Sequence, residues 1–255
     1  MELKKIDKFR KGNLDLQNTN RKIPYIIYQT FKTNQIPINM YTAISSWLEK
    51  NPAYDYYFYD DNDILEYIEN YNYSKYNFNF TKEELLKAYH KIKPGAGKAD
   101  LFRLLAIYNT GGCYFDVDTV CENPLDDYIL EDDEIVTGLG IRGDFHQWAL
   151  IYTKHHDFIK KTIENCVGNI LQETFFISRN IEGATGPYCY DCSIKQILRI
   201  PFKSRFRSGS WTIGKYNFRI LSKDLMGGNI IFKYGGYFKD LENIGLKYYS
   251  KLDLY

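Results

Sequence analysis

The sequence predicts an α/β fold in which a parallel sheet is flanked by helices. Two observations lead to this prediction. Apolar runs of strand length alternate with segments of helical periodicity through the first half of the chain, a pattern typical of parallel α/β sheets. In addition, a pair of aspartates stands directly after a predicted strand, at the edge of such a sheet where ligands bind.

Length and composition indicate one large globular unit. The chain has 255 residues, of which 44% are hydrophobic, so we expect a single domain over residues 1–255. Within it, residues 1–21 form a polar lead-in, loose or helical, and the Asn- and aromatic-rich residues 70–80 form a surface loop. The net charge is only +1, which does not suggest a nucleic-acid-binding protein because such proteins usually carry a strong basic excess.

The sequence shows no recognisable signal peptide or membrane span. Residues 1–21 lack an apolar core, as a signal peptide would require, and no apolar run approaches the length of a spanning helix. The five cysteines are odd in number and are not spaced as a disulfide scaffold or a zinc site. These observations predict a soluble, cytoplasmic protein with reduced, buried thiols.

The first four elements alternate strictly between strand and helix. An apolar run at 23–30, rich in β-forming residues, predicts the first strand. Apolar residues at spacings of three and four over 40–48 predict a helix. A second strand is predicted at 54–59. A second helix begins near Asp63, which we interpret as its cap because Glu66 follows three residues later.

The middle of the chain predicts two helices and a strand. The first helix covers roughly 82–91, and a turn is expected at 93–97. A mostly buried helix then runs from Lys98. Glycines at 111–112 end it, as left-handed helix stops commonly do. The strand at 113–116 follows directly.

Fewer elements are predicted in the second half of the chain. Residues 135–139 predict a strand, and helices are expected at 155–171 and 187–198. The last third mixes short strands with Gly-rich turns, such as those at 227–228 and 235–236.

Asp116 and Asp118 are the strongest candidates for chemistry. On an extended backbone residues two apart point to the same face, and two carboxylates on one face make a hard oxygen site for Mn²⁺ or Mg²⁺. Such an ion could neutralise a diphosphate leaving group. A D-x-D pair by itself also occurs on solvated turns. It is not an EF-hand, because Cys121 stands where that loop requires glycine.

The residues before this pair carry a more specific pattern. Residues 98–118 read KADLFRLLAIYNTGGCYFDVD, which combines a helix opening K-[AS]-D-x-x-R, a Gly-Gly turn and a strand ending in D-x-D. This stretch closely resembles the signature of glycosyltransferase family 32, the DXD sugar-binding transferases. That family includes yeast-type mannosyltransferases, α-galactosyl and α-GlcNAc transferases and bacterial capsule transferases. Similar residues at 23–31, at 47–61 and at 185–187 extend the resemblance to about residues 22–190.

The resemblance implies both a fold and an activity. The fold would be of GT-A type, with a mostly parallel sheet flanked by helices and a nucleotide-binding half. The protein would be a metal-dependent glycosyltransferase, transferring a hexose or N-acetylhexosamine from a UDP- or GDP-sugar. The acceptor would be a glycan, a lipid-linked molecule or a protein, and the anomeric configuration would be retained. The cofactor would be Mn²⁺ or Mg²⁺.

Four residues acquire candidate catalytic roles from their positions in the family motif. Asp116 and Asp118 would bind the metal. Asp100 would hydrogen-bond hydroxyls of the donor sugar, and Arg103 would contact the sugar or its diphosphate. The last two are i and i+3 on one helix, so both could face the same cleft.

Two further groups are implied with less detail. At the end of the first strand, Gln29, Thr30 and Phe31 would line the nucleotide, with Phe31 either stacked on the base or part of the core. A loop after the strand at 135–139 could face the acceptor, and His146 could act there as a general base. The candidate residues of this acceptor-side loop are Asp144, His146 and Gln147.

The sequence departs from the family pattern in two places. Tyr28 stands where the family often has histidine. No histidine follows His156, although the family often carries one close to the diphosphate. Ser210, the segment 233–239 or no protein group at all could supply this contact.

These departures leave other functions open. The chain could be a nucleotide-sugar-binding protein with degenerate catalysis, or a donor hydrolase. A Mg²⁺-dependent phosphohydrolase would usually bring a further carboxylate or histidine cluster near the pair, and the sequence shows none. A basic run, most simply a solvated face, could also make peripheral contact with a membrane or an anionic lipid-linked acceptor. Its residues are Arg199, Lys203, Arg205 and Arg207.

Overall fold

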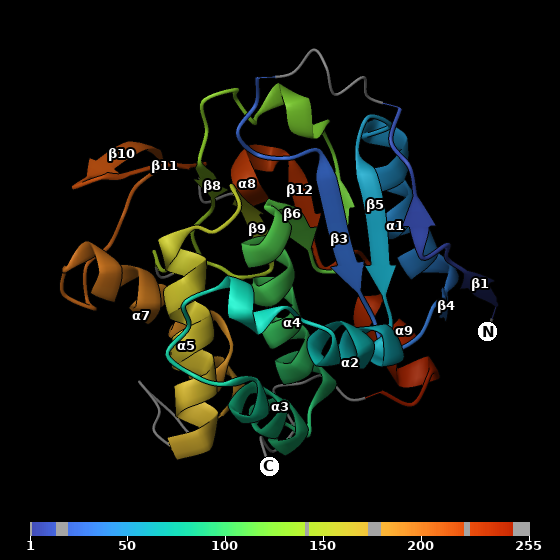
Figure 1. Cartoon of the computed structure of the whole chain (residues 1–255). Coiled ribbons are helices and arrows are strands. Elements are labelled where there is room, and N and C mark those ends of the chain that lie inside the picture. Colours follow the sequence, from blue (N-terminus) through green and yellow to red (C-terminus); the bar gives the residue numbers. More distant parts are fainter. Residues whose placement is uncertain (1, 14–19, 141–142, 173–179, 222–224, 247–255) are drawn as a thin grey trace.

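The computed structural model describes residues 2–13, 20–140, 143–172, 180–221 and 225–246. Among these residues, eight strands form one mixed sheet (Figure 1). The strands are β2 (Phe9–Arg10), β3 (Ile26–Thr30), β5 (Asp55–Tyr59), β6 (Gly112–Phe115), β8 (Ile135–Thr137), β9 (Ala149–Tyr152), β10 (Gly209–Ile213) and β11 (Tyr216–Ile220). Their order across the sheet is β10-β11-β8-β9-β6-β3-β5-β2.

The sheet combines parallel and antiparallel pairs. β3 pairs in parallel with β5 and with β6, and β8 pairs in parallel with β11. β9 runs antiparallel between β6 and β8, and the edge strands β2 and β10 are also antiparallel to their neighbours. The predicted α/β sheet is therefore confirmed: β3, β5, β6, β8 and β11 run in one direction, and β2, β9 and β10 run in the other.

Helices cover both faces of the sheet. They are α1 (Ile38–Lys50), α2 (Asp61–Glu69), α3 (Lys82–Lys91), α4 (Gly95–Thr110), α5 (Asp157–Gln172), α6 (Ile181–Ala184), α7 (Pro187–Leu198), α8 (Leu225–Gly228) and α9 (Tyr237–Asn243). Successive strand residues alternate between the two faces. Tyr28 and Tyr114 join the core formed with α2 to α5 and α7, whereas Ile27 and Cys113 join the core formed with α1. Of the helices in the described part of the chain, none is both long and apolar enough to cross a membrane.

Two short sheets lie beside the main one. β1 (Leu3–Lys5) pairs antiparallel with β4 (Gln35–Pro37). β7 (Thr119–Cys121) pairs antiparallel with β12 (Ile230–Phe232). The second pairing brings the last described part of the chain next to the residues that follow β6.

Two helices have the bounds that the sequence predicts, α3 at 82–91 and α7 at 187–198. Local signals define their first turns. Thr81 and Glu84 form a capping box before α3, in which each side chain accepts the other residue's amide at 3.2 and 2.7 Å. Pro187 occupies the first position of α7, where its missing N–H costs no helical hydrogen bond.

The predicted cap of α2 is wrong by three residues. α2 begins at Asp61, and its N-cap is Asp60. The Asp60 carboxylate accepts the amides of Asn62 and Asp63 at 3.1 Å each, and the Asp63 carboxylate accepts the Asp60 amide at 2.8 Å. Asp63 is therefore the third helical residue of a capping box, a position that we had assigned to Glu66.

The buried helix α4 begins earlier than predicted. Gly95–Gly97, expected in a turn, form its first turn after Pro94, whose carbonyl accepts the amides of Gly97 and Lys98 at 3.1 and 3.3 Å. Its predicted end is confirmed, because Gly111 follows the last turn with φ +71°, a backbone conformation that glycine adopts without strain.

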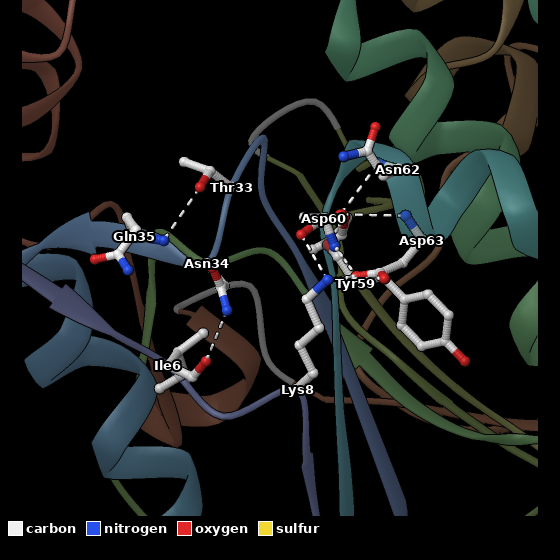
Figure 2. A network of polar contacts seen from close by, with 10 residues as sticks. Ile6, Lys8, Thr33, Asn34, Gln35, Tyr59, Asp60, Asn62 and Asp63 are labelled. Atoms are coloured by element: carbon white, nitrogen blue, oxygen red, sulfur yellow. Dashed lines mark hydrogen bonds and ion pairs between the residues drawn. The ribbon is translucent and has the colours of Figure 1, made fainter.

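The polar lead-in over residues 2–13 is not helical but forms the short strands β1 and β2. β2 adds to the edge of β5 and so satisfies backbone groups of both strands. Between the two strands, Lys8 Nζ lies 2.7 Å from Asp60 and 2.8 Å from Asp63, at the N-terminus of α2 (Figure 2). Ile6 exchanges two hydrogen bonds with Asn34. The lead-in is thus fixed to the body of the protein at several points.

The segment 70–80 is irregular apart from one turn of 3₁₀ helix at Tyr73–Lys75. Its asparagines are exposed while its aromatic rings are partly buried against the core formed with α2 to α5. The tyrosine hydroxyl of Tyr76 donates to the side chain of Asn109 at the end of α4. This alternation of polar and aromatic residues gives the segment one solvated face and one packed face.

All five cysteines are buried and none forms a disulfide. Cys189 and Cys192 both lie within α7, without a second cysteine pair or histidines around them that could complete a zinc site in the described part of the chain. The expectation that the five thiols are buried is confirmed.

We predict that Trp47→Phe destabilises the protein by about 1–3 kcal/mol. Trp47 is fully buried on α1, stacks on Phe115 with centroids 3.8 Å apart, and donates its indole N–H to the Thr119 carbonyl at 3.1 Å. The variant leaves that carbonyl without its donor and opens a void. Chemical denaturation measures the change. Glu49→Gln, exposed on the same helix, is the control, and equal unfolding midpoints for the two variants would contradict the prediction.

Candidate active site

Arg103 stands at the centre of the candidate site. Its Nη2 lies 2.9 Å from Oδ1 of Asp116 and 3.4 Å from Oδ1 of Asp100, one helical turn away on α4. The guanidinium carbon lies 4.6 Å from the centroid of the Tyr114 ring. Arg103 and Asp100 are both buried, so one buried cation holds two carboxylates from different elements.

Asp116, directly after β6, is fixed on several sides. The Tyr114 hydroxyl donates to Asp116 Oδ1 at 2.9 Å. Its main-chain carbonyl accepts Thr119 Oγ1 at 2.6 Å and Gln29 Nε2 at 3.4 Å. Its amide donates to the Trp148 carbonyl at 2.9 Å. The position of this carboxylate is therefore set by β3, β6 and the segment before β9.

A turn, and not an extended strand, brings Asp118 beside Asp116. The Thr119 amide donates to the Asp116 carbonyl at 3.1 Å, which closes a four-residue turn over 116–119. The argument from alternating strand residues is therefore wrong at this point, although both carboxylates are in the site. Asp118 is buried, and its Oδ1 has no hydrogen-bonding partner among the described residues.

The electrostatics of the three carboxylates favour an additional cation. Burial raises the pKa of Asp100 to about 6, even though Arg103 and Thr185 lower it. Burial also raises the pKa of Asp116, against the opposing effect of Arg103. For Asp118, burial and then the neighbouring Asp116 carboxylate raise the pKa to about 8. One buried guanidinium does not offset the charge of all three groups.

The C-terminal segment supplies a second positive group at this turn. Because β12 pairs with β7, the Tyr234 amide reaches the Asp118 carbonyl at 3.0 Å. The Lys233 ammonium lowers the pKa of both Asp116 and Asp118. Lys233 has a left-handed backbone (φ +61°), and its Nζ lies over the rings of Phe232 and Phe238 at 5.0 and 5.3 Å. Of the options for the C-terminal contact, the segment 233–239 is the one that lies here.

Ser210 lies elsewhere in the fold. It is exposed on the edge strand β10, and β11, β8 and β9 separate β10 from β6. Ser210 therefore does not belong to the group of residues around Asp116. In the basic run that precedes β10, Arg205 packs against Gly143.

Gln147, from the acceptor-side loop, is part of the site. Its carbonyl accepts Arg103 Nη1 at 3.1 Å, and its Nε2 donates to the Thr185 carbonyl at 3.1 Å. Thr185 in turn donates its hydroxyl to Asp100 Oδ2 at 2.9 Å. The sequence had marked Thr185 only as part of a family motif, and the structure shows that it holds Asp100 in place.

His146 and Asp144 are placed differently from Gln147. The His146 ring is buried and stacks on Trp148 at 4.2 Å, and burial lowers its pKa to about 4. Asp144 packs over Gly140 and is half-buried. Within the described residues, neither side chain hydrogen-bonds Asp116 or Asp118, so the structure does not bring them into contact with the pair.

The three residues at the end of β3 are held mainly by the core. Gln29 accepts the hydroxyl of Tyr56 at 3.1 Å and is fully buried. Thr30 donates its hydroxyl to the Tyr59 carbonyl at 2.7 Å. Phe31 is half-buried and packs against the core formed with α1. Gln29 and Thr30 end the strand next to β6, and Phe31 follows it. Of the three, only Gln29 hydrogen-bonds Asp116 among the described residues.

Asp116 and Asp118 fit a divalent cation that takes its remaining ligands from a substrate. In the parts of the chain that the structure describes, no cluster of three His, Cys, Asp or Glu side chains could enclose a metal. The buried Oδ1 of Asp118 is nevertheless a hard oxygen ligand that has no hydrogen-bonding partner among the described residues. Mg²⁺ and Mn²⁺ sites often consist of one or two carboxylates completed by phosphate oxygens and water.

Comparison with protein families supports the resemblance seen in the sequence. Residues 37–135 match the family described as "Glycosyltransferase sugar-binding region containing DXD motif". That region contains the candidate residues from Asp100 to Asp118. The resemblance predicted from residues 98–118 is therefore confirmed.

Several fungal proteins are similar over part of the chain. Inositol phosphoceramide mannosyltransferase 3 of Schizosaccharomyces pombe is 32% identical over 109 residues, covering 43% of this chain and 28% of that protein. Initiation-specific alpha-1,6-mannosyltransferase of Candida albicans is 29% identical over 163 residues, covering 59% and 40%. Mannosyl phosphorylinositol ceramide synthase SUR1 of Saccharomyces cerevisiae is 27% identical, covering 73% and 46%. The chain thus spans less than half the length of each of these relatives.

A solved structure shares the fold. The PaToxG glycosyltransferase superposes with a TM-score of 0.55, at 19% identity, over 70% of this chain and 71% of its own. The likeness shows the fold predicted from the sequence, the GT-A type of α/β sheet flanked by helices.

We predict that Asp118→Asn stabilises the metal-free protein at about pH 8 but not at about pH 5. The pKa of Asp118 is raised in the fold, so the folded state holds a proton that the unfolded chain releases. Stability from this group is therefore lost as pH rises from about 4, the ordinary aspartate value, to about 8.

Denaturation in EDTA at both pH values tests this prediction. Asparagine cannot ionise, so a gain of about 1 kcal/mol, or roughly 2–4 °C in Tm, is expected at the higher pH. The exposed Asp127→Asn serves as the control. A gain that is equal at the two pH values would show that Asp118 is not a buried, destabilised carboxylate.

Proposed function

Taking residues 37–135 as a glycosyltransferase sugar-binding region, we propose that the protein is a metal-dependent glycosyltransferase. The donor is a UDP- or GDP-sugar, and the transferred unit is a hexose or N-acetylhexosamine. The acceptor is a glycan, a lipid-linked molecule or a protein, and the configuration is retained, as the family resemblance implies. One observation carries the proposal. The buried guanidinium of Arg103 lies between Asp100 and Asp116, and Oδ1 of the neighbouring Asp118 has no hydrogen-bonding partner among the described residues.

Asp116 and Asp118 would hold Mn²⁺ or Mg²⁺. When bound, the ion neutralises the diphosphate leaving group as a Lewis acid. Asp118 suits this role because its buried Oδ1 has no hydrogen-bonding partner among the described residues. Asp116 suits it because four groups from the protein fix its carboxylate or its main chain in one position. A ligand that does not move requires no reorganisation when the substrate arrives.

Asp100 and Arg103 would orient the donor sugar. Thr185 and Arg103 each engage one oxygen of Asp100, which fixes the plane of the carboxylate. Carboxylates accept hydrogen bonds from sugar hydroxyls, and the guanidinium donates in a fixed fork that suits hydroxyl and phosphate oxygens. The Arg103 side chain also donates a hydrogen bond to the main-chain carbonyl of Gln147, which fixes its position relative to the segment before β9.

Lys233 would contact the diphosphate in place of the family's histidine. Its ammonium is close enough to lower the pKa of both aspartates, and β12 holds its backbone beside the turn at 116–119. An ammonium group is a strong phosphate binder. The proposal therefore does not require a histidine in this segment.

We expect the wild-type protein to release nucleoside diphosphate from one member of a panel of UDP- and GDP-sugars in the presence of Mn²⁺. Asp118→Asn should lower this rate about 100-fold or more, because a group that stabilises transition-state charge is lost. EDTA should abolish the reaction. Asp127→Asn, which changes an exposed carboxylate nearby, should leave it unchanged.

The outcomes of this assay separate the proposed activities. Diphosphate release without transfer to any offered acceptor would indicate a donor hydrolase. Metal-dependent donor binding without turnover would indicate a binding protein. If no donor binds or reacts, the proposed function is wrong.

We further predict that Lys233→Met lowers turnover by about 10- to 100-fold, the loss expected for one hydrogen bond to a charged group. Lys233→Arg should retain most activity because it keeps the charge. Lys87→Met, at an exposed position on α3, is the matched control. Steady-state kinetics with the identified donor and circular dichroism check activity and folding. Equal rates for Lys233→Met and the control would remove Lys233 from the site.

A further inference from the structure

A cavity of about 510 Å³ lies between β5, α2 and the segment that follows α2. β3 separates β5 from β6, which leads to Asp116, so the cavity lies one strand beyond the candidate active site. Its volume is in the range of small-molecule binding sites. None of the residues that line it has a role in the proposed transfer reaction.

Tyrosine rings form the floor and one wall of this cavity. Tyr57 and Tyr59 are alternate residues of β5, so both project to the face covered by α2. Tyr57 packs between Phe9 and Tyr28, with centroids 5.0 and 5.4 Å away. Tyr67, on α2, meets Tyr59 edge-on at 5.8 Å. Tyr57, Tyr59 and Tyr67 are only half-buried, which leaves part of each ring accessible.

The helix α4 holds this aromatic wall in place. Phe102 is fully buried and contacts Tyr59 and Tyr67 at centroid distances of 4.6 and 5.3 Å. Tyr57 and Tyr59 each carry a hydroxyl group at the end of a ring that lines the cavity. The wall therefore combines fixed ring faces with polar tips that can bond a ligand.

Amide groups surround the rings. Asn70, Asn72 and Asn109 line the cavity. The side chain of Asn109 is oriented by the hydroxyls of Tyr67 and Tyr76. An amide offers both donors and acceptors, which is the pairing that adjacent hydroxyl groups require.

The charges of the residues that line the cavity sum to zero. Lys8 and Lys75 oppose Asp63 and Glu66, and Lys8 is already paired with Asp63 at 2.8 Å (Figure 2). A phosphate-bearing ligand would need an excess of positive charge, and an amine would need an excess of negative charge. The balance favours an uncharged, polar ligand.

We propose that this cavity binds a neutral saccharide. The tyrosine faces would pack against the C–H face of a pyranose ring, while the asparagines and the tyrosine hydroxyls would bond its hydroxyls. The Tyr59 carbonyl accepts Thr30 Oγ1 at 2.7 Å and the Phe31 amide at 3.2 Å, so the cavity adjoins the end of β3. A glycan bound here can extend toward the candidate active site. That the glycan is the acceptor rests on the proposed function, whereas saccharide binding itself does not.

Binding of α-linked mannotriose and maltotriose to the whole chain tests the proposal. Saturation-transfer NMR and calorimetry would be run with EDTA and without nucleotide, so that the donor site does not contribute. We expect millimolar binding of at least one of these sugars. Tyr57→Ala and Asn70→Ala should weaken it at least about tenfold, and Tyr57→Phe should largely retain it because the ring remains.

The controls separate this site from the transferase site. Asn79→Ala, an exposed asparagine outside the cavity, should bind as wild type. Asp118→Asn should also bind as wild type, so loss of transfer and loss of saccharide binding are independent readouts. Absence of binding by the wild-type protein would overturn the proposal. So would unchanged binding by Asn70→Ala and Tyr57→Ala, both of which change residues that are not fully buried.

Discussion

The guanidinium of Arg103 is the group on which the arrangement of the candidate site depends. It is buried, yet it bonds Asp116 after β6, faces Asp100 on its own helix and donates to the carbonyl of Gln147. Burying a cation costs free energy of desolvation, which paired charges and hydrogen bonds must offset. Three separate parts of the chain are therefore held at set distances by one side chain, and Thr185 completes the arrangement by bonding Asp100.

The negative charges of the two aspartates beside Arg103 are not equally balanced by protein groups. Asp116 has Arg103 and Tyr114 as partners, whereas Oδ1 of Asp118 has no hydrogen-bonding partner among the described residues. The positive charges of Lys233 and Arg103 lower the pKa of Asp118 without offsetting the effect of its burial. Natural proteins satisfy nearly all of their buried polar groups. An unsatisfied carboxylate oxygen beside a fixed carboxylate suits a site for a cation that arrives with the substrate. If both carboxylates were fully hydrogen-bonded, they would have to lose contacts with the protein before they could bind the cation.

The sequence predicted correctly those helix bounds that depend on residues close together in the chain. The bounds predicted for α3 and α7 and the glycine predicted to end α4 agree with the structure. In the structure a capping box at Thr81 and the proline at 187 fix the first turns of α3 and α7. The family motif identified the carboxylates and Arg103. It did not identify how Asp118 is presented, because a strand that continues and a strand that turns at 116–119 have the same residue spacing.

Contacts between distant segments could not be predicted from the sequence. Nothing local to Thr185 indicates that it bonds Asp100, and nothing near Lys233 indicates pairing between β12 and β7. β9 was not predicted from the sequence, and it pairs antiparallel with both β6 and β8. His146 was considered as a base because of its residue type, but its burial against Trp148 depends on packing that one sequence does not reveal.

The pairing of β12 with β7 has a consequence for how the protein matures. A ribosome releases the chain from its N-terminus, so β6 and its two aspartates emerge well before Lys233. Until β12 docks, the turn at 116–119 lacks both the neighbouring ammonium and the Tyr234 amide that bonds Asp118. The nascent sheet can form while this acidic turn is still open to water, and the docking of β12 then encloses the turn and partly neutralises it.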